Sequence, residues 1–151
     1  MRMLLISLVV IVLIIALTGV WFFKQGNSDL VSGETTVKIG SGEYIVEIAD
    51  SPALKAKGLS GRDGLDAGQG MLFIFNPVSK TSFWMKGMKF SIDIIWIADG
   101  EVVSIEERAS LPKGMNIPVY RPKVKANYVL EVNAGEVEKH GIKVGDKVEI
   151  R

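Results

Sequence analysis

Apolar and polar side chains alternate along the chain from residue 35 onward, in short segments that predict β-strands. In Glu43–Ala49, for example, Tyr44, Val46 and Ile48 share one face, as expected for a strand with one buried face. Short segments rich in Val, Ile, Phe and Trp are typical of strands rather than helices. We expect strands at 35–39, 43–49, 71–75, 90–97, 101–107, 128–133 and 148–150.

The stretch Gly70–Ile97 is the densest apolar part of the chain outside its N-terminus, so we expect the core to be built on it. In its last strand, alternation places Trp96 in the core together with Ile92 and Ile94. Asp93 interrupts the same strand. A carboxylate among apolar neighbours needs a charged or hydrogen-bonding partner, which makes Asp93 a candidate for a structural or a catalytic role.

Helical signals are few and short. Asp50–Gly58 has a capping residue, an early proline and a final glycine, and Ala134–His140 can form a second short helix. Leu111–Asn127 has prolines at 112, 118 and 122 and is predicted to be a long ordered loop. We therefore expect an all-β fold, a small barrel- or sandwich-like domain of about seven short strands. A parallel doubly wound sheet is disfavoured, because neither helix is long enough to link parallel strands.

The N-terminal segment has a different pattern. Met3–Phe23 is 21 residues without a charge, between Arg2 and Lys24, and a helix of that length spans the hydrocarbon core of a bilayer, roughly 30 Å. We expect a transmembrane anchor at 1–24, a flexible tether at 25–34 and the β domain at 35–151. A cleaved signal peptide is the alternative. The positive-inside rule favours a single-pass protein of the cytoplasmic membrane with its C-terminal domain outside the cytoplasm.

Composition narrows the chemistry further. The sequence has no cysteine and one histidine, His140, so neither a thiolate nor a histidine-cluster metal site is expected. Residues 25–151 have 16 basic and 17 acidic side chains, a balance that does not favour nucleic acid as a partner. We expect no cofactor and no metal. The thioethers of Met71, Met85, Met88 and Met115 could bind Cu(I), but methionine more commonly fills gaps in a core.

Several short motifs follow one another in a recognisable order. They are GLSGR at 58–62, GMLFIF at 70–75, FWMKGM at 83–88, IDII at 92–95, YVLEVNAG at 128–135 and GIKVGD at 141–146. In these motifs the chain resembles the DUF192 family over about residues 36–151, with Ser91 where proline is common in the family. The resemblance implies a small, mostly β domain, often behind a signal or an anchor. It implies no reaction, so the candidate site has to be argued from the residues.

Three charged residues form the first candidate site. Asp93 and Glu131 both lie in apolar strands, and Arg62, on a glycine-rich loop, could bind either of them through two hydrogen bonds. One interpretation is an ion-pair network that holds the loop against the sheet. The other is a carboxylate pair with an orienting arginine, as general acid–base catalysis requires.

An exposed aromatic forms the second candidate site. If Phe83 and Met85 are buried, alternation presents Trp84 and Lys86 together on the surface, where an indole beside a cation could stack on a sugar ring. Arg121 and the lysines of the 111–127 loop add positive charge.

Three functions remain open at this point. We favour a non-catalytic module that binds a glycan, a small molecule or a protein through Trp84, Lys86, Arg62, Asp93 and Arg121. The alternatives are a hydrolase that uses Asp93 and Glu131, and a structural accessory subunit of a membrane complex.

Overall fold

Nine strands and two short helices make up residues 32–151, the part of the chain that the computed structural model describes. The strands are β1 (Glu34–Ile39), β2 (Gly42–Ala49), β3 (Gln69–Ser79), β4 (Phe83–Trp84), β5 (Ile92–Ala98), β6 (Glu101–Ala109), β7 (Val119–Tyr120), β8 (Ala126–Asn133) and β9 (Val148–Ile150). The helices are α2 (Pro52–Lys57) and α3 (Glu136–His140). The predicted strands and helices are confirmed, and the mostly β fold class with them; β4 and β7 were not predicted.

The N-terminal predictions lie outside the described residues. This applies to the transmembrane anchor at 1–24 and to most of the tether at 25–34. Within residues 32–151, no helix is both long enough and apolar enough to cross a membrane.

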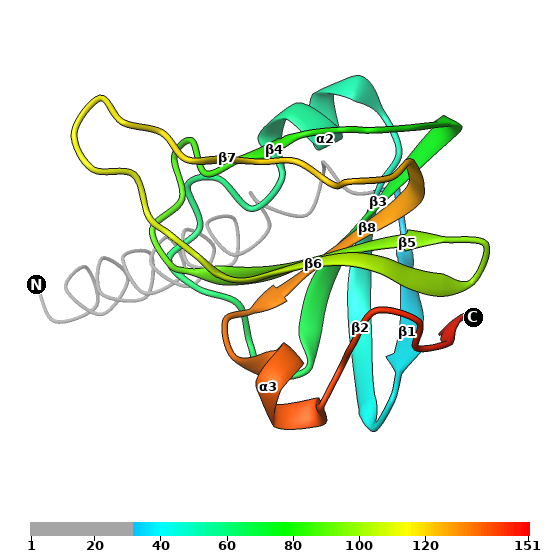
Figure 1. The fold of residues 1–151 in the computed structure, drawn as a ribbon. Coiled ribbons are helices and arrows are strands. Elements are labelled where there is room, and N and C mark those ends of the chain that lie inside the picture. The colour runs from blue at the N-terminus through cyan, green and yellow to red at the C-terminus, as the bar shows by residue number, and fades with distance from the viewer. Residues whose placement is uncertain (1–31) are drawn as a thin grey trace, which may run out of the picture. The chain divides into compact units, whose positions relative to one another are not determined.

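Seven strands form one curled sheet, in the order β6-β5-β8-β3-β2-β1-β9 (Figure 1). The segment before β9 joins the two edges at one end. Val102 in β6 donates its backbone N–H to Asp146 at 2.9 Å and accepts from Gly145 at 2.8 Å, while β9 itself pairs with β1. The sheet is therefore a half-barrel that the C-terminal segment closes at one end.

One pair of neighbouring strands is parallel, contrary to the expectation that the helices are too short to link parallel strands. β2 and β3 run in the same direction, with Glu47 opposite Met71. The connection between them contains α2, only six residues long, followed by a loop that runs to Gly68. Helix length alone was the wrong criterion, because the irregular loop supplies the rest of the crossover.

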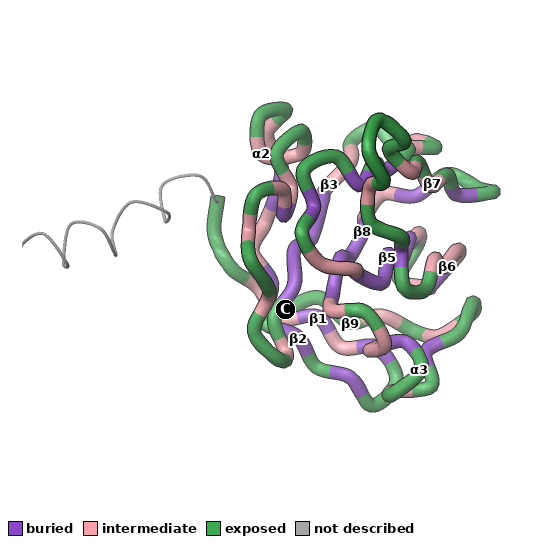
Figure 2. Tube along the Cα trace, turned by 90° about the vertical axis from the view of Figure 1, so that its left-hand side faces the viewer, coloured by how far each residue is buried: buried purple, intermediate pink, exposed green. Residues whose placement is uncertain are grey.

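The sheet is buried on both faces. One cluster of buried side chains, which includes Leu59, Phe73 and Trp96, lies under α2 and the β4–β7 ribbon. The other, which includes Val46 and Ile95, lies on the opposite face, beside α3. Figure 2 shows the buried positions along the strands and the exposed ones in the surrounding loops. Both clusters consist of residues from one compact unit, Val31–Arg151, so we treat this unit as an independently folding domain.

Asp93, in β5, is fully buried on the face that also carries Ile95. Its carboxylate accepts three backbone N–H groups: from Arg108 at 2.8 Å, from Gly135 at 3.0 Å and from Val137 at 2.8 Å. Arg108 lies where the β5–β6 register shifts and has a positive φ of 51°. The other two donors are at the start of α3, whose own N-cap residue, Gly135, has no side chain to cap it. Asp93 therefore fixes both the irregularity in β6 and the start of α3.

Replacing Asp93 tests this structural role. All three partners are donors, so Asp93→Asn must turn its amide NH₂ toward at least one N–H, and we expect a loss of about 2 kcal/mol in the free energy of unfolding. Asp93→Ala leaves every donor unpaired and should cost at least about 3 kcal/mol. Urea unfolding of residues 31–151 measures both. Asp66→Asn, at an exposed position, is the control and should change the free energy of unfolding very little. An effect of Asp93→Asn as small as that of the control would contradict the structural role of Asp93.

Candidate functional site

One row of directly opposed residues crosses four strands on the face that is covered by α2. Glu47 in β2 lies opposite Met71 in β3, Met71 opposite Glu131 in β8, and Glu131 opposite Ile94 in β5. Opposed residues on paired strands share a face. Glu47 and Glu131 are therefore two strand spacings apart, about 10 Å, with the buried Met71 between them.

Arg62 binds the carboxylate of Glu47. Its two terminal nitrogens donate to the two carboxylate oxygens, each at 2.6 Å. The pair is partly buried and attaches the glycine-rich loop after α2 to the sheet. The predicted ion-pair network of Arg62 with Asp93 and Glu131 was wrong. Arg62 does hold the loop to the sheet, but through Glu47, because the parallel β2–β3 pairing brings Glu47 under the loop.

Glu131 lacks such a partner. Its side chain is buried, 5% exposed, and its Oε2 atom accepts no hydrogen bond within residues 32–151. Burial raises the pKa of Glu131 to about 8, and the nearby positive charge of Arg62 opposes this rise. At neutral pH the carboxyl group is consequently mostly protonated and can donate a hydrogen bond.

A pocket of about 80 Å³ leads to this carboxyl group. That volume corresponds to two or three water molecules, at roughly 30 Å³ each. Gly58 lies over the Oε2 atom: a Cβ at this position would be 3.9 Å from it and 3.3 Å from the Phe73 ring. Aromatic side chains form much of the wall, and lysines and hydroxyl groups lie nearer the surface. The lining side chains include Phe73, Phe75, Phe83, Trp84, Lys55, Lys57, Ser60, Thr81 and Ser82.

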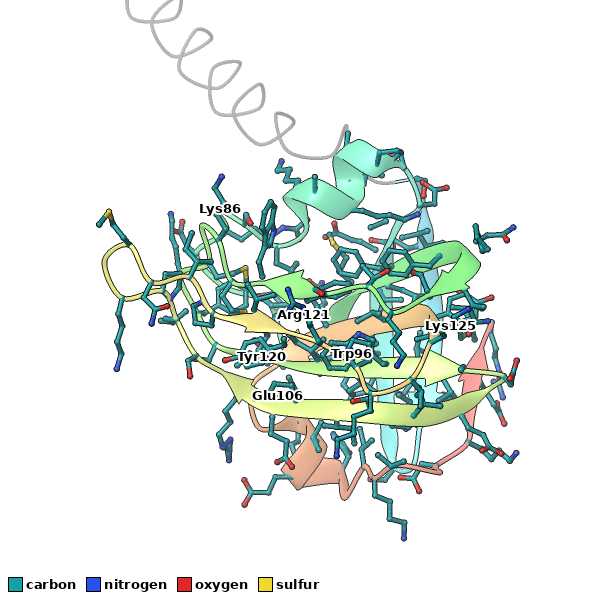
Figure 3. The ribbon with its side chains drawn as sticks, turned by 45° about the horizontal axis from the view of Figure 1, so that its top comes forward. Lys86, Trp96, Glu106, Tyr120, Arg121 and Lys125 are labelled. Carbon is teal, nitrogen blue, oxygen red and sulfur yellow. The ribbon has the colours of Figure 1, made fainter. Side chains whose placement is uncertain are left out.

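Trp84 and Lys86 lie together at the surface, as predicted. The indole is 52% exposed, and the Lys86 ammonium lies 5.5 Å from its ring centroid, while the intervening Met85 is buried. Arg121 donates from Nε to the hydroxyl group of Ser82, at 3.0 Å. Figure 3 shows Lys86 pointing away from the sheet and Arg121 on the side that also carries Trp96.

The structure separates the two carboxylates of the hydrolase hypothesis. Asp93 lies opposite Val132, and the next residue, Ile94, lies opposite Glu131. The two side chains therefore point to opposite faces of the sheet. They cannot flank one bond of a substrate, so this geometry removes the basis for that hypothesis. It also removes Asp93 from the expected ligand-binding set.

Three charged residues of this site, Glu47, Lys55 and Lys57, were not predicted from the sequence, and neither were the lining hydroxyl groups and phenylalanines. The lysines are the basic residues in the last turn of α2, and their positive charge near the end of a short helix is the signal that could have found them. Glu47 could have been found only by knowing that β2 pairs with β3, which the hydrophobic pattern does not encode.

The four methionines considered as Cu(I) ligands fall into two environments. Met71, Met85 and Met88 are buried in the cluster under α2, whereas Met115 is fully exposed on the long loop. Within residues 32–151, no three His, Cys, Asp or Glu side chains form a group that could hold a metal ion.

Comparisons with known proteins agree with the fold. A sequence model of the DUF192 family, described as "Uncharacterized ACR", matches residues 35–150. A solved structure from Sinorhizobium meliloti 1021, provisionally described as a transcription regulator, is 29% identical, covers 82% of this chain and 98% of its own, and has a TM-score of 0.72. A protein of unknown function from Novosphingobium aromaticivorans DSM 12444 is 34% identical, covers 83% of this chain and 89% of its own, and has a TM-score of 0.71. No curated protein matches the chain significantly.

The raised pKa of Glu131 predicts how stability depends on pH. The unfolded chain releases this proton near pH 4.5 and the folded domain near pH 8. The folded state thus binds more protons between these values, and the free energy of unfolding should fall as pH rises, by up to about 1.4 kcal/mol per pH unit. Glu131→Gln is the matched neutral variant. The difference between wild type and Glu131→Gln in urea unfolding should change steadily across this window; a constant difference would contradict the raised pKa.

Proposed function

The chain belongs to the DUF192 family over residues 35–150, and we propose that its domain is a non-catalytic module that binds a small sugar acid in the Glu131 pocket. The observation that carries the proposal is the unpartnered Oε2 atom of Glu131 at a pocket lined by aromatic rings. A buried polar atom without a partner is costly, and a ligand oxygen that accepts a hydrogen bond from this carboxyl group would remove that cost.

Charge around the pocket favours an acidic ligand. Lys55 and Lys57 line it, Lys86 lies beside Trp84, and Arg121 binds the lining residue Ser82. The single acidic residue in the lining, Glu131, is mostly neutral at pH 7. A carboxylate on the ligand would therefore meet positive charge near the surface, while a hydroxyl group reaches Glu131.

The exposed Trp84 favours a ring. A pocket of about 80 Å³ admits only one hydroxyl-bearing end of a sugar, so the rest of the sugar must lie outside it. The indole offers an apolar surface beside the pocket for that part of the ligand. Hexuronic acids combine a ring, hydroxyl groups and one carboxylate, and they are the class that we select.

Catalysis is not part of the proposal. General acid–base hydrolysis of a glycoside requires two carboxyl groups on either side of the bond. The lining of this pocket includes one carboxyl group, Glu131, and no histidine.

We further propose that the domain acts at a membrane. The uncharged run Met3–Phe23 supports an N-terminal anchor, and the position of Arg2 supports an N-terminus in the cytoplasm. The domain would then face the outside of the cytoplasmic membrane, where acidic sugars of the cell surface are accessible to it.

Binding assays with residues 31–151 test the ligand class. Glucuronate or galacturonate should bind, and the corresponding neutral sugar should bind at least about tenfold more weakly, since it lacks the charge that the lysines meet. Trp84→Ala should abolish binding and leave the melting temperature nearly unchanged, because the indole is half exposed. Isothermal titration calorimetry and thermal unfolding measure these effects. Equal affinity for both sugars, or a large loss of stability in Trp84→Ala, would contradict the proposal.

Affinity should also depend on pH through Glu131. As pH rises through about 8, this carboxyl group ionises, loses its donor proton and repels the anionic ligand, so binding should weaken. Glu131→Gln keeps an N–H donor and has no charge to lose, so it should bind the ligand with little change across the same range. A wild-type affinity that is constant from pH 6 to pH 9 would show that Glu131 does not contact the ligand.

A further inference from the structure

We propose that a second surface of this domain docks on a bilayer that contains anionic lipids. This ribbon surface consists of residues 78–89 and 111–125, which include the β4–β7 ribbon and its flanking loops. It adjoins the Glu131 pocket, whose lining includes Thr81–Trp84 and Met88 of the ribbon surface, but residues 111–125 lie outside that lining.

The two segments lie side by side. Trp84 pairs with Val119, the Met85 N–H donates to the Pro118 carbonyl oxygen at 3.0 Å, and Ser79 lies opposite Ala126. Figure 1 shows β4 and β7 adjacent, with the loop before β7 projecting beyond the sheet. Residues distant in the sequence therefore form one continuous surface.

The charge of the ribbon surface has a single sign. Its two segments have seven basic residues, all exposed, and no aspartate or glutamate. One of the seven, Lys89, binds Asp63 from a neighbouring loop at 2.7 Å. The domain as a whole is close to neutral, so this surface concentrates positive charge. Basic side chains near a bilayer are attracted to anionic headgroups.

Exposed apolar side chains lie among these cations. Seven of the ten large hydrophobic residues that are exposed within residues 32–151 belong to the ribbon surface. Met115, at the end of the projecting loop, is 100% exposed. The six that lie on β4, β7 and the long loop are Trp84, Leu111, Met115, Ile117, Val119 and Val124. Apolar side chains surrounded by lysine and arginine are typical of proteins that insert shallowly into a membrane interface, and tryptophan is enriched there.

This combination favours a bilayer over a nucleic acid. A nucleic-acid surface uses its cations for phosphates and aromatic rings for bases, and it has no use for exposed methionine, isoleucine and valine side chains. A bilayer meets both needs, with anionic headgroups for the lysines and an acyl region for the apolar tips. The length of the chain before the domain also fits a bilayer as the partner. Between the predicted anchor and the first described residue, Ser32, residues 24–31 can span at most about 30 Å, which would keep the domain close to the bilayer.

Vesicle sedimentation tests the proposal with residues 31–151, which lack the predicted anchor. The domain should sediment with vesicles of phosphatidylcholine that include phosphatidylglycerol and remain in solution with pure phosphatidylcholine. Lys113→Ala/Lys123→Ala/Lys125→Ala should weaken binding at least tenfold, and raising the salt concentration should do the same. Met115→Asp/Ile117→Asp should also weaken it, because aspartate cannot enter the acyl region.

Matched control variants distinguish binding through the ribbon surface from a general effect of net charge. Lys139→Ala/Lys143→Ala/Lys147→Ala changes the net charge equally, at exposed sites in α3 and between α3 and β9, and should bind vesicles like the wild type. Met115→Asp/Ile117→Asp lies outside the lining of the Glu131 pocket and should bind glucuronate like the wild type, so loss of lipid binding and loss of sugar binding are distinguishable. All variants should keep the wild-type circular dichroism spectrum.

Three results would overturn the proposal. They are no sedimentation with phosphatidylglycerol vesicles, an equal loss in the control triple variant, and binding to duplex DNA that is tighter than binding to vesicles and insensitive to Met115→Asp/Ile117→Asp.

Discussion

The fold depends on a sheet whose central strands are buried on both faces. In β5, six consecutive residues, Ile92–Ile97, are buried, because α2 and the β4–β7 ribbon cover one face and α3 lies beside the other. A polar side chain in such a strand cannot be hydrated, so it must find its partners within the protein. Whether a buried polar side chain finds these hydrogen-bond partners therefore decides whether it stabilises the fold or is available to a ligand.

The two buried carboxyl groups meet it in opposite ways. Asp93 accepts three backbone N–H groups and ties β6 and α3 to the sheet, so its hydrogen-bonding capacity serves the fold. Glu131, on the other face of the sheet, has an Oε2 atom without a partner among the described residues and lies at a pocket. A satisfied group holds the structure together, whereas an unsatisfied group beside a pocket is available to a ligand. Two buried carboxyl groups on neighbouring strands, β5 and β8, therefore have different roles: Asp93 is structural and Glu131 is a candidate ligand-binding group.

The α2 side of the sheet carries both proposed interactions. The pocket and the ribbon surface share Trp84, a half-exposed indole with a lysine ammonium over its ring. Positive charge near this indole comes from α2, from the segment after β4 and from the residue that follows β7. A surface of this kind suits a protein that works next to a membrane and binds acidic ligands there.

Sequence alone determined seven of the nine strands, the face of Trp96, the exposure of Trp84 and the need of Asp93 for partners within the protein. These follow from local patterns: side chains on a strand alternate with a period of two, and a carboxylate within an apolar segment needs a partner. The family resemblance was likewise carried by local motifs and is confirmed over residues 35–150. Tertiary structure decided everything that depends on which strands are neighbours. The parallel β2–β3 pairing placed Glu47, not Glu131 or Asp93, under Arg62, and the β5–β8 register put the two candidate carboxylates on opposite faces. Pairing is a long-range property that no local pattern in one sequence encodes, so the partner of Arg62 and the isolation of Glu131 became visible only in the folded domain.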